Sequence, residues 1–209
     1  GVRQVIFRPS NAIIELVDEG FLIPTAQQVA ERAGVGIRSV FRHFDDMDSI
    51  FETANSIIFE SVKPLFVGGD RSGTLEVRIL HATEQLTTGY ASTRNFFLSG
   101  KVRMWNTLIV QKNYHLNQRR LQKELEDWIP EILELTEQGK QSAYALASFD
   151  YWHKLSDLQV FEKKVTINII SNKIRQLFHK LKKATCPLTK LKPTTQQPNT
   201  KTHLTAHET

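Results

Sequence analysis

The sequence predicts an all-α protein with an N-terminal three-helix head, which contains a helix-turn-helix, and a larger helical body. Two short helices joined by a glycine turn follow from the caps and apolar spacing between Thr25 and Phe44. In later segments apolar residues recur every three or four positions, and no period-two alternation persists. We expect the head at residues 1–48, the body at 49–183 and a tail at 184–209.

The chain has 209 residues, 40% of them hydrophobic, which is enough apolar material for a core. Its charge is unevenly distributed along the sequence. Residues 1–50 hold five Lys/Arg and seven Asp/Glu, whereas residues 173–209 hold eight Lys/Arg and one Asp/Glu. The pI of about 9.3 therefore comes from the C-terminus, so DNA binding has to be argued from the helix-turn-helix alone.

The first helix is expected from Pro9 to Glu19, because proline fits a first helical turn, where its missing N–H costs nothing. Its inward residues are Ala12, Ile13, Leu16 and Val17. Arg3 and Arg8 precede it; they are either a frayed basic end, the reading we favour, or contacts to a DNA backbone.

The next two helices form the helix-turn-helix. Thr25 with Gln28 three positions later is a capping box, and Gly34 ends the helix because glycine adopts the left-handed conformation without penalty. A second short helix follows from about Gly36. Its apolar residues are expected to point inward: Ile37, Val40, Phe41 and Phe44. The outward residues are then Arg38, Ser39, Arg42 and His43.

This outward face favours DNA over a merely solvated helix face. It carries two arginines, a serine and a histidine, and no acid lies between Ile37 and Phe44. Arginine can pair bidentately with guanine, and serine can bond phosphate or base. The residues predicted to contact double-stranded DNA are Thr25, Gly36, Ile37, Arg38, Ser39, Arg42 and His43.

The same stretch resembles a known family. The run Thr25…Val29-Ala30…Ala33-Gly34-Val35-Gly36…Val40-Phe41-Arg42-His43-Phe44…Asp48…Ile50 is similar to the signature of the tetracycline-repressor (TetR/AcrR) family of bacterial regulators. Ala12, Leu16 and Gly20 match its first helix, so the resemblance covers about residues 8–60. It implies a ligand-responsive transcriptional regulator, a repressor that binds a palindromic operator as a homodimer.

This chain also departs from the family pattern. Phe41 stands where the family commonly has a tyrosine that touches phosphate, and Gly36 replaces a common serine. Asp45 and Asp46 stand near a helix start where the family often has lysine. An alternative is therefore a helical ligand- or protein-binding module whose head no longer reads DNA.

The body is expected to be helical throughout. Asp45 or Asp46 caps a helix that reaches about Phe66 and is apolar on more than one side, as a helix packed between two bodies would be. The glycine-rich stretch 68–73 lacks the lysine of a P-loop and is interpreted as a connector. Further helices are expected at about 74–90, 93–112, 117–138 with Pro130 interrupting, 141–158 and 160–183.

The last two of these helices carry apolar stripes. One stripe consists of Ile167, Ile170, Ile174, Leu177 and Leu181, which recur at spacings of three and four. Such a stripe belongs either to an intrachain core or to a dimer seam. In the resembled family the corresponding helices form a four-helix dimer bundle, so the prediction is a homodimer built on residues 141–183, with Ile174 in the seam.

Large apolar side chains in residues 74–158 either fill the core or wall a cavity for a small apolar or amphipathic effector. The residues predicted to bind this ligand are Phe96, Phe97, Arg103, Trp105, Phe149 and Trp152.

Other classes of site find little support. The sequence has no recognisable Ser/His/Asp arrangement and no glycine-rich strand-turn-helix, so we expect neither an enzyme nor a cofactor. With Cys186 alone there is no intrachain disulfide or cysteine metal cluster, and the His203/His207 pair is not taken as a metal site.

No apolar run spans a membrane and no signal peptide is visible, so the expected location is cytoplasmic. The Thr-, Lys-, Gln- and Pro-rich tail is predicted to be disordered and basic.

Overall fold

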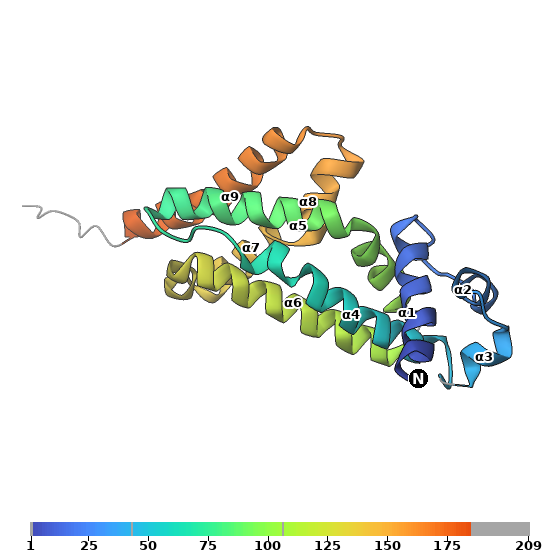
Figure 1. Ribbon diagram of the computed structural model, residues 1–209. Helices are drawn as coiled ribbons and strands as arrows, with labels where there is room; N and C mark the ends of the chain where they lie inside the picture. Colours follow the sequence, from blue (N-terminus) through green and yellow to red (C-terminus); the bar gives the residue numbers. More distant parts are fainter. Residues whose placement is uncertain (1, 43, 106, 185–209) are drawn as a thin grey trace, which may run out of the picture.

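The computed structural model describes residues 2–42, 44–105 and 107–184, and none of these residues lies in a strand. The helices are α1 (Val2–Asp18), α2 (Ala26–Ala33), α3 (Ile37–Phe41), α4 (Met47–Val67), α5 (Leu75–Arg103), α6 (Leu108–Trp128), α7 (Glu137–Leu146), α8 (Phe149–His153) and α9 (Lys163–Ala184). A 3-10 turn, η1 (Pro130–Glu134), follows α6, and a π-helical turn, η2 (Lys154–Leu158), follows α8. The head lies at one end of the elongated body (Figure 1). The all-α prediction is confirmed.

The head is built around a small aliphatic core. Its buried residues come from α1 to α4: Ala12, Ile13, Leu16, Val17, Val29, Ala30, Val40, Phe44, Ile50 and Ala54. Two alanines in this core, Ala12 and Ala30, let helix backbones approach closely. Arg32 on α2 pairs with Glu19 at 2.7 Å and Glu15 at 3.4 Å, which ties α2 to the end of α1.

Helix α4 belongs to both cores. Ile50 and Ala54 in its first turns are buried in the head, whereas Phe66 near its end is buried in the body. This confirms the expectation of a helix packed between two bodies. The division of the chain at residues 48 and 49 remains a prediction, because the helix passes through it without a break.

The body core is rich in aromatic rings and brings together residues that lie far apart in the sequence. Helix α5 runs beside α9, and α4 runs beside α6 (Figure 1). Tyr90 lies at the centre: its ring is 5.3 Å from Phe97 and 5.6 Å from Phe149, and its hydroxyl donates to the Ala147 carbonyl at 2.8 Å. Burial raises the pKa of this hydroxyl well above its usual range. Tyr90 therefore serves packing, as a fully buried donor with a satisfied partner.

Several expected helix boundaries are wrong. Pro9 lies inside α1, where it is buried, so packing of this helix compensates for the missing N–H. Residues 90–93 do not break a helix: α5 continues to Arg103 with a kink at Thr93, whose hydroxyl bonds the Gly89 carbonyl at 2.7 Å. The segment expected as one helix at 141–158 consists of α7, α8 and η2. The tail at 185–209 lies outside the described residues.

The predicted dimer seam is also corrected. Ile167, Ile170 and Ile174 are 8%, 3% and 1% exposed, because α9 packs this stripe against the core that α5 helps to form. The sequence left two interpretations of this stripe open, an intrachain core and a dimer seam. The burial of these three residues supports the intrachain core. Ile174 therefore cannot lie in a seam between two copies.

Candidate nucleic-acid interface and ligand cavity

The turn between α2 and α3 is fixed by local hydrogen bonds. The Thr25 hydroxyl accepts from the Gln28 N–H at 3.3 Å, and the Gln28 side chain accepts from the Thr25 N–H at 2.8 Å. The predicted capping box is thus confirmed. Gly34 has φ +66°, and the N–H of Val35 behind it bonds the Ala30 carbonyl at 3.0 Å. This C-cap determines the direction in which α3 leaves the turn.

Helix α3 buries only one of its side chains. Val40 is fully buried and Phe44 just after the helix is 7% exposed, but Ile37 and Phe41 are each 42% exposed. The expectation that these two residues point inward is wrong. A helix of five residues has one narrow contact with the head core, and Val40 fills it.

The outward face of α3 is therefore partly apolar as well as basic. Arg38 and Arg42, four residues apart, are exposed together with Gly36, and Ser39 is half-buried. Thr25 is exposed at the start of α2; His43 lies outside the described residues. Phe41 joins this face although the sequence assigned it to the core. Helix length was the signal that could have placed it, because one turn and a half cannot bury two stripes.

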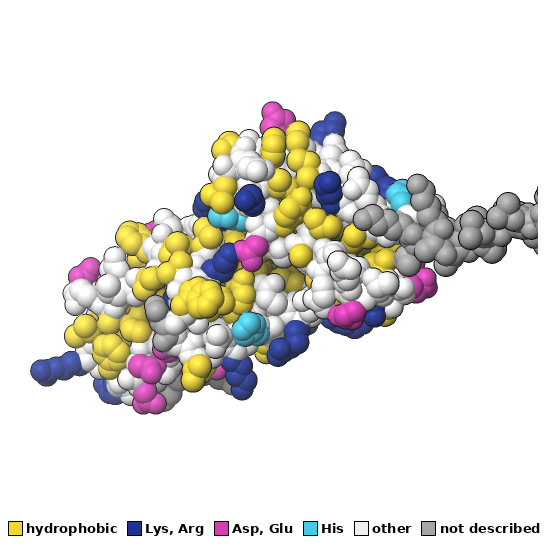
Figure 2. Space-filling model, turned by 180° about the vertical axis from the view of Figure 1, so that it is seen from behind, with side chains coloured by type: hydrophobic (Ala, Val, Ile, Leu, Met, Phe, Trp, Pro, Cys, Tyr) yellow, Lys and Arg dark blue, Asp and Glu magenta, His cyan; other side chains and the backbone are white. Residues whose placement is uncertain are grey.

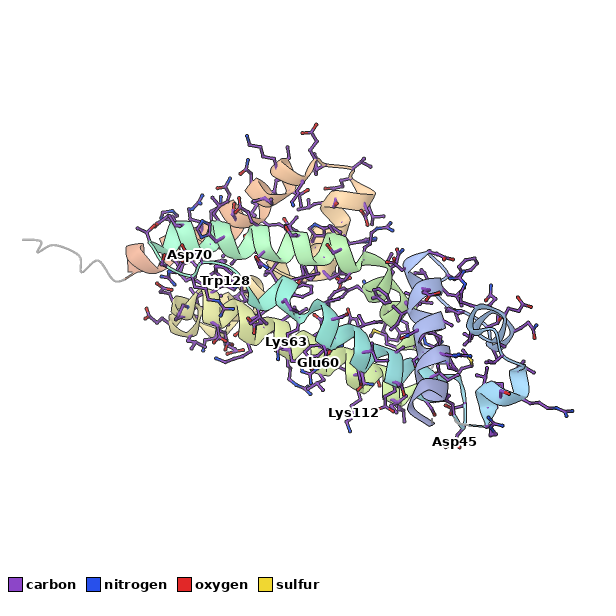
Figure 3. All side chains as sticks on the ribbon, viewed as in Figure 1. Asp45, Glu60, Lys63, Asp70, Lys112 and Trp128 are labelled. Carbon is purple, nitrogen blue, oxygen red and sulfur yellow. The ribbon has the colours of Figure 1, made fainter. Side chains whose placement is uncertain are left out.

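The acids of the head are largely engaged away from this face. Hydrogen bonding from Arg32 lowers the pKa of Glu19, and Asp46 caps α4 by accepting from the Ser49 N–H at 2.8 Å. The Ser49 hydrogen bonds likewise lower the pKa of Asp46. Asp45 is exposed in the α3–α4 connection, close to α3 (Figure 3). Of these acids, Asp45 is therefore the one placed to weaken contact with a polyanion.

A cavity of about 530 Å³ lies between α1, α4, α5 and α6, within the size range of ligand pockets. Three of the predicted ligand residues, Phe96, Phe97 and Arg103, line it. Glu60 and Lys63 lie at its rim on α4, where this helix runs beside α6 (Figure 3). That these residues bind a ligand remains a prediction.

The other three predicted ligand residues do not line this cavity. Phe149 and Trp152 are 1% and 3% exposed in the aromatic core, where Phe149 stacks on Phe97 at 4.6 Å. Trp105 is 79% exposed in the connection between α5 and α6. The expectation that all six share one cavity is wrong, because α8 packs behind α5 and Trp105 follows the end of that helix.

One face of α5 holds the head against the body. The Asn95 amide donates to the Asp18 carbonyl at 2.7 Å, and the Ser99 hydroxyl donates to the Leu22 carbonyl at 2.7 Å. Arg103 pairs with Asp48 at the start of α4 at 2.5 Å. Because residues 95, 99 and 103 recur every four positions, all three contacts come from one side of the helix. We call these three residues the α5 clamp.

Neither a metal-binding cluster nor a membrane span is present in the part of the chain that the structure describes. No group of three or more His, Cys, Asp or Glu side chains there is placed to hold a metal ion. In the same residues no helix has the length and apolar character needed to cross a membrane.

Residues 11–54 match the family model described as bacterial regulatory proteins, tetR family. The fold is similar to that of a transcriptional regulator from Rhodococcus sp. RHA1, at 16% identity and a TM-score of 0.66, over 84% of this chain and 96% of that chain. A TetR transcriptional regulator from the same source is 17% identical with a TM-score of 0.57, over 87% of this chain and 100% of that chain. No curated protein sequence gives a significant match. The helix-turn-helix region therefore matches the tetR family model, and the chain shares its fold with these two regulators.

Proposed function

We propose that the chain is a ligand-responsive repressor that binds a palindromic DNA operator as a homodimer. The observation that carries the DNA-binding part is the exposed face of α3, where Arg38 and Arg42 lie beside Ile37 and Phe41. Arginines can pair with guanine in the major groove, and apolar side chains can contact thymine methyl groups. Buried Val40 fixes the rotation of α3 that presents this face.

The α5 clamp supports the ligand-responsive part. Ligand binding shifts an equilibrium only through different affinities for two arrangements. The cavity and the head share α5 and α4, so a molecule in the cavity touches the same helices that hold the head. A coupling of about 1–3 kcal/mol would change operator affinity roughly 5- to 150-fold.

The connection between α8 and α9 supports a dimer. Leu158, Val160, Phe161 and Val165 are 69%, 79%, 41% and 39% exposed, within the predicted range 141–183. Hydrophobic side chains gather over this protruding upper part of the body (Figure 2). Contact with a second copy would cover this apolar surface. A two-fold axis there predicts operator half-sites about one helical turn, or a small multiple, apart.

A mobility-shift titration on the DNA upstream of the gene tests this function. Each of Arg38→Ala and Arg42→Ala should cost about 1–3 kcal/mol of specific binding if the lost contact is bidentate to guanine. The matched control is Lys112→Ala with Arg119→Ala, which removes two exposed charges from α6 and should leave operator affinity unchanged. Normal operator binding by a folded Arg38→Ala/Arg42→Ala variant would exclude this face. In that case the helical binding module without DNA readout becomes the better description.

A further inference from the structure

Arg103 is a buried charged residue, at 8% exposure. Its Nη2 pairs with Asp48 at 2.5 Å, and its guanidinium lies 3.3 Å above the centre of the Phe51 ring. Its Nε–H is buried and has no hydrogen-bond partner in the structure. Burial lowers the pKa of Arg103, and Asp48 opposes that effect. A guanidinium is not deprotonated in proteins, so Arg103 is a buried cation whose Nε–H has no partner.

An unsatisfied buried donor is costly, about 1–3 kcal/mol and more on a charged group. An oxygen acceptor in the cavity would remove this cost, because Arg103 lines the cavity. A carboxylate matches best, since its two oxygens fit two parallel N–H groups of a guanidinium.

The rest of the cavity is suited to an apolar chain. Its wall includes Ile13, Phe51, Ile58, Phe96, Phe97 and Ile109. The other charged lining residues differ from Arg103 in exposure or pairing. Lys63 and Arg120 are exposed at the surface, and Glu124 pairs with Arg71 at 2.9 Å. Arg103 would thus contact the charged group of a ligand, and the apolar wall would contact its hydrocarbon part.

We propose that the cavity binds an amphipathic carboxylate whose anionic group is paired by Arg103 in competition with Asp48. This proposal rests on the ligand-responsive function above and names the class of ligand. The Asp48 side chain is 26% exposed and can turn to water, whereas that of Arg103 is 10% exposed and cannot. The ligand therefore takes over the buried cation and releases the start of α4 from the end of α5. Those two helix ends form one link of the α5 clamp.

Calorimetric titration of the full chain without DNA tests this proposal. The probes are octanoate, octan-1-ol and octylamine, which share one alkyl chain and differ in head-group charge. Octanoate should bind about 10- to 100-fold more tightly than octan-1-ol, as expected for a charge-assisted hydrogen bond. Octylamine should bind most weakly, because Arg103 repels it.

Two variants probe the two partners of the pair. Arg103→Met should abolish the preference for octanoate and keep the affinity for octan-1-ol. Asp48→Asn should strengthen octanoate binding several-fold, because it removes the competing carboxylate, and leave octan-1-ol unchanged. Lys63→Met is the matched control: it removes a cation at the rim and should preserve the preference. If Arg103→Met does not fold, Asp48→Asn decides the question alone.

Equal binding of octanoate and octan-1-ol, absence of octanoate binding at millimolar concentration, or weaker octanoate binding by Asp48→Asn would each overturn the proposal. These outcomes are independent of the DNA-binding test. A chain that binds octanoate through Arg103 and never binds operator would overturn the proposed function and leave the ligand class standing.

Discussion

The cores of the head and the body differ in the side chains that fill them and in how far apart those residues lie in the sequence. Among residues whose burial the structure describes, those of the head core lie between Ala12 and Ala54, and most are small aliphatic side chains. The body core joins residues as far apart as Phe66 and Phe178, around a cluster of aromatic rings. The proposed functional surface of the head faces outward on α3, whereas that of the body faces inward. A local motif can thus specify an exposed surface, but a cavity requires distant segments.

The two regions are not independent, because α4 enters both cores and the α5 clamp joins them. Substitutions that act on one region and spare the other therefore test how separate they are.

Removing a ring from the body core should have the largest effect. Phe149→Ala should destabilise the chain by about 3–5 kcal/mol, because Phe149 is 1% exposed and contacts Tyr90, Phe97 and Trp152. Urea denaturation followed by circular dichroism measures this loss. Leu133→Ala is the control, since Leu133 is 52% exposed and should lose far less. Similar losses for the two variants would mean that the aromatic cluster does not hold the body together.

The next largest loss of stability is expected at Gly89, where α4 and α5 approach closely. A Cβ on Gly89 would lie 2.6 Å from the Phe66 ring, so Gly89→Ala should cost about 1–3 kcal/mol from overpacking, less about 0.5–1 kcal/mol gained in helix propensity. Gly100→Ala on the same helix is the matched control. Its Cβ would meet Tyr114 at an ordinary 3.8 Å, so this variant should be neutral or more stable. Thermal unfolding compares the two, and equal melting temperatures would contradict the steric argument.

Removing one threonine N-cap from each region compares the head and the body directly. Thr25→Ala in the head and Thr136→Ala in the body each remove a cap worth about 1 kcal/mol. Both should lower stability by similar amounts in urea denaturation. Only Thr25→Ala should weaken operator binding, because its helix α2 leads into α3. An equal loss of operator affinity in Thr136→Ala would show that the head cannot be perturbed separately.

The smallest effect concerns the exposed acid beside α3. Asp45→Asn should strengthen operator binding by about 0.2–1 kcal/mol, the range of exposed charge interactions, because it removes repulsion from phosphates. Glu84→Gln on α5 makes the same charge change far from α3 and should have no effect. The difference should shrink in high salt, which screens exposed charges. A gain that persists at high salt would point to a cause other than charge.

Much of the head could be predicted because its signals are local. A cap such as Thr25 needs only the residue three positions later, and Gly34 needs only its own backbone angle. The N-cap at Asp46 follows the same logic. The orientation of Arg38 and Arg42 came from helical period alone. The exposure of Ile37 and Phe41 did not follow, because period assigns apolar residues to an inner face without showing how wide that face is.

Residue patterns alone predicted the fold class, the helix-turn-helix, the basic face of α3 and three of the residues that line the cavity. Which apolar stripes are buried within one chain depends instead on how the helices pack against one another. Ile174 lies in the core because α9 packs against α5, and Phe149 lies behind Phe97 because α8 covers that helix. The pairing of Arg103 with Asp48 joins residues 55 positions apart. Periodicity describes how a segment folds onto itself, whereas burial depends on which distant segment covers it.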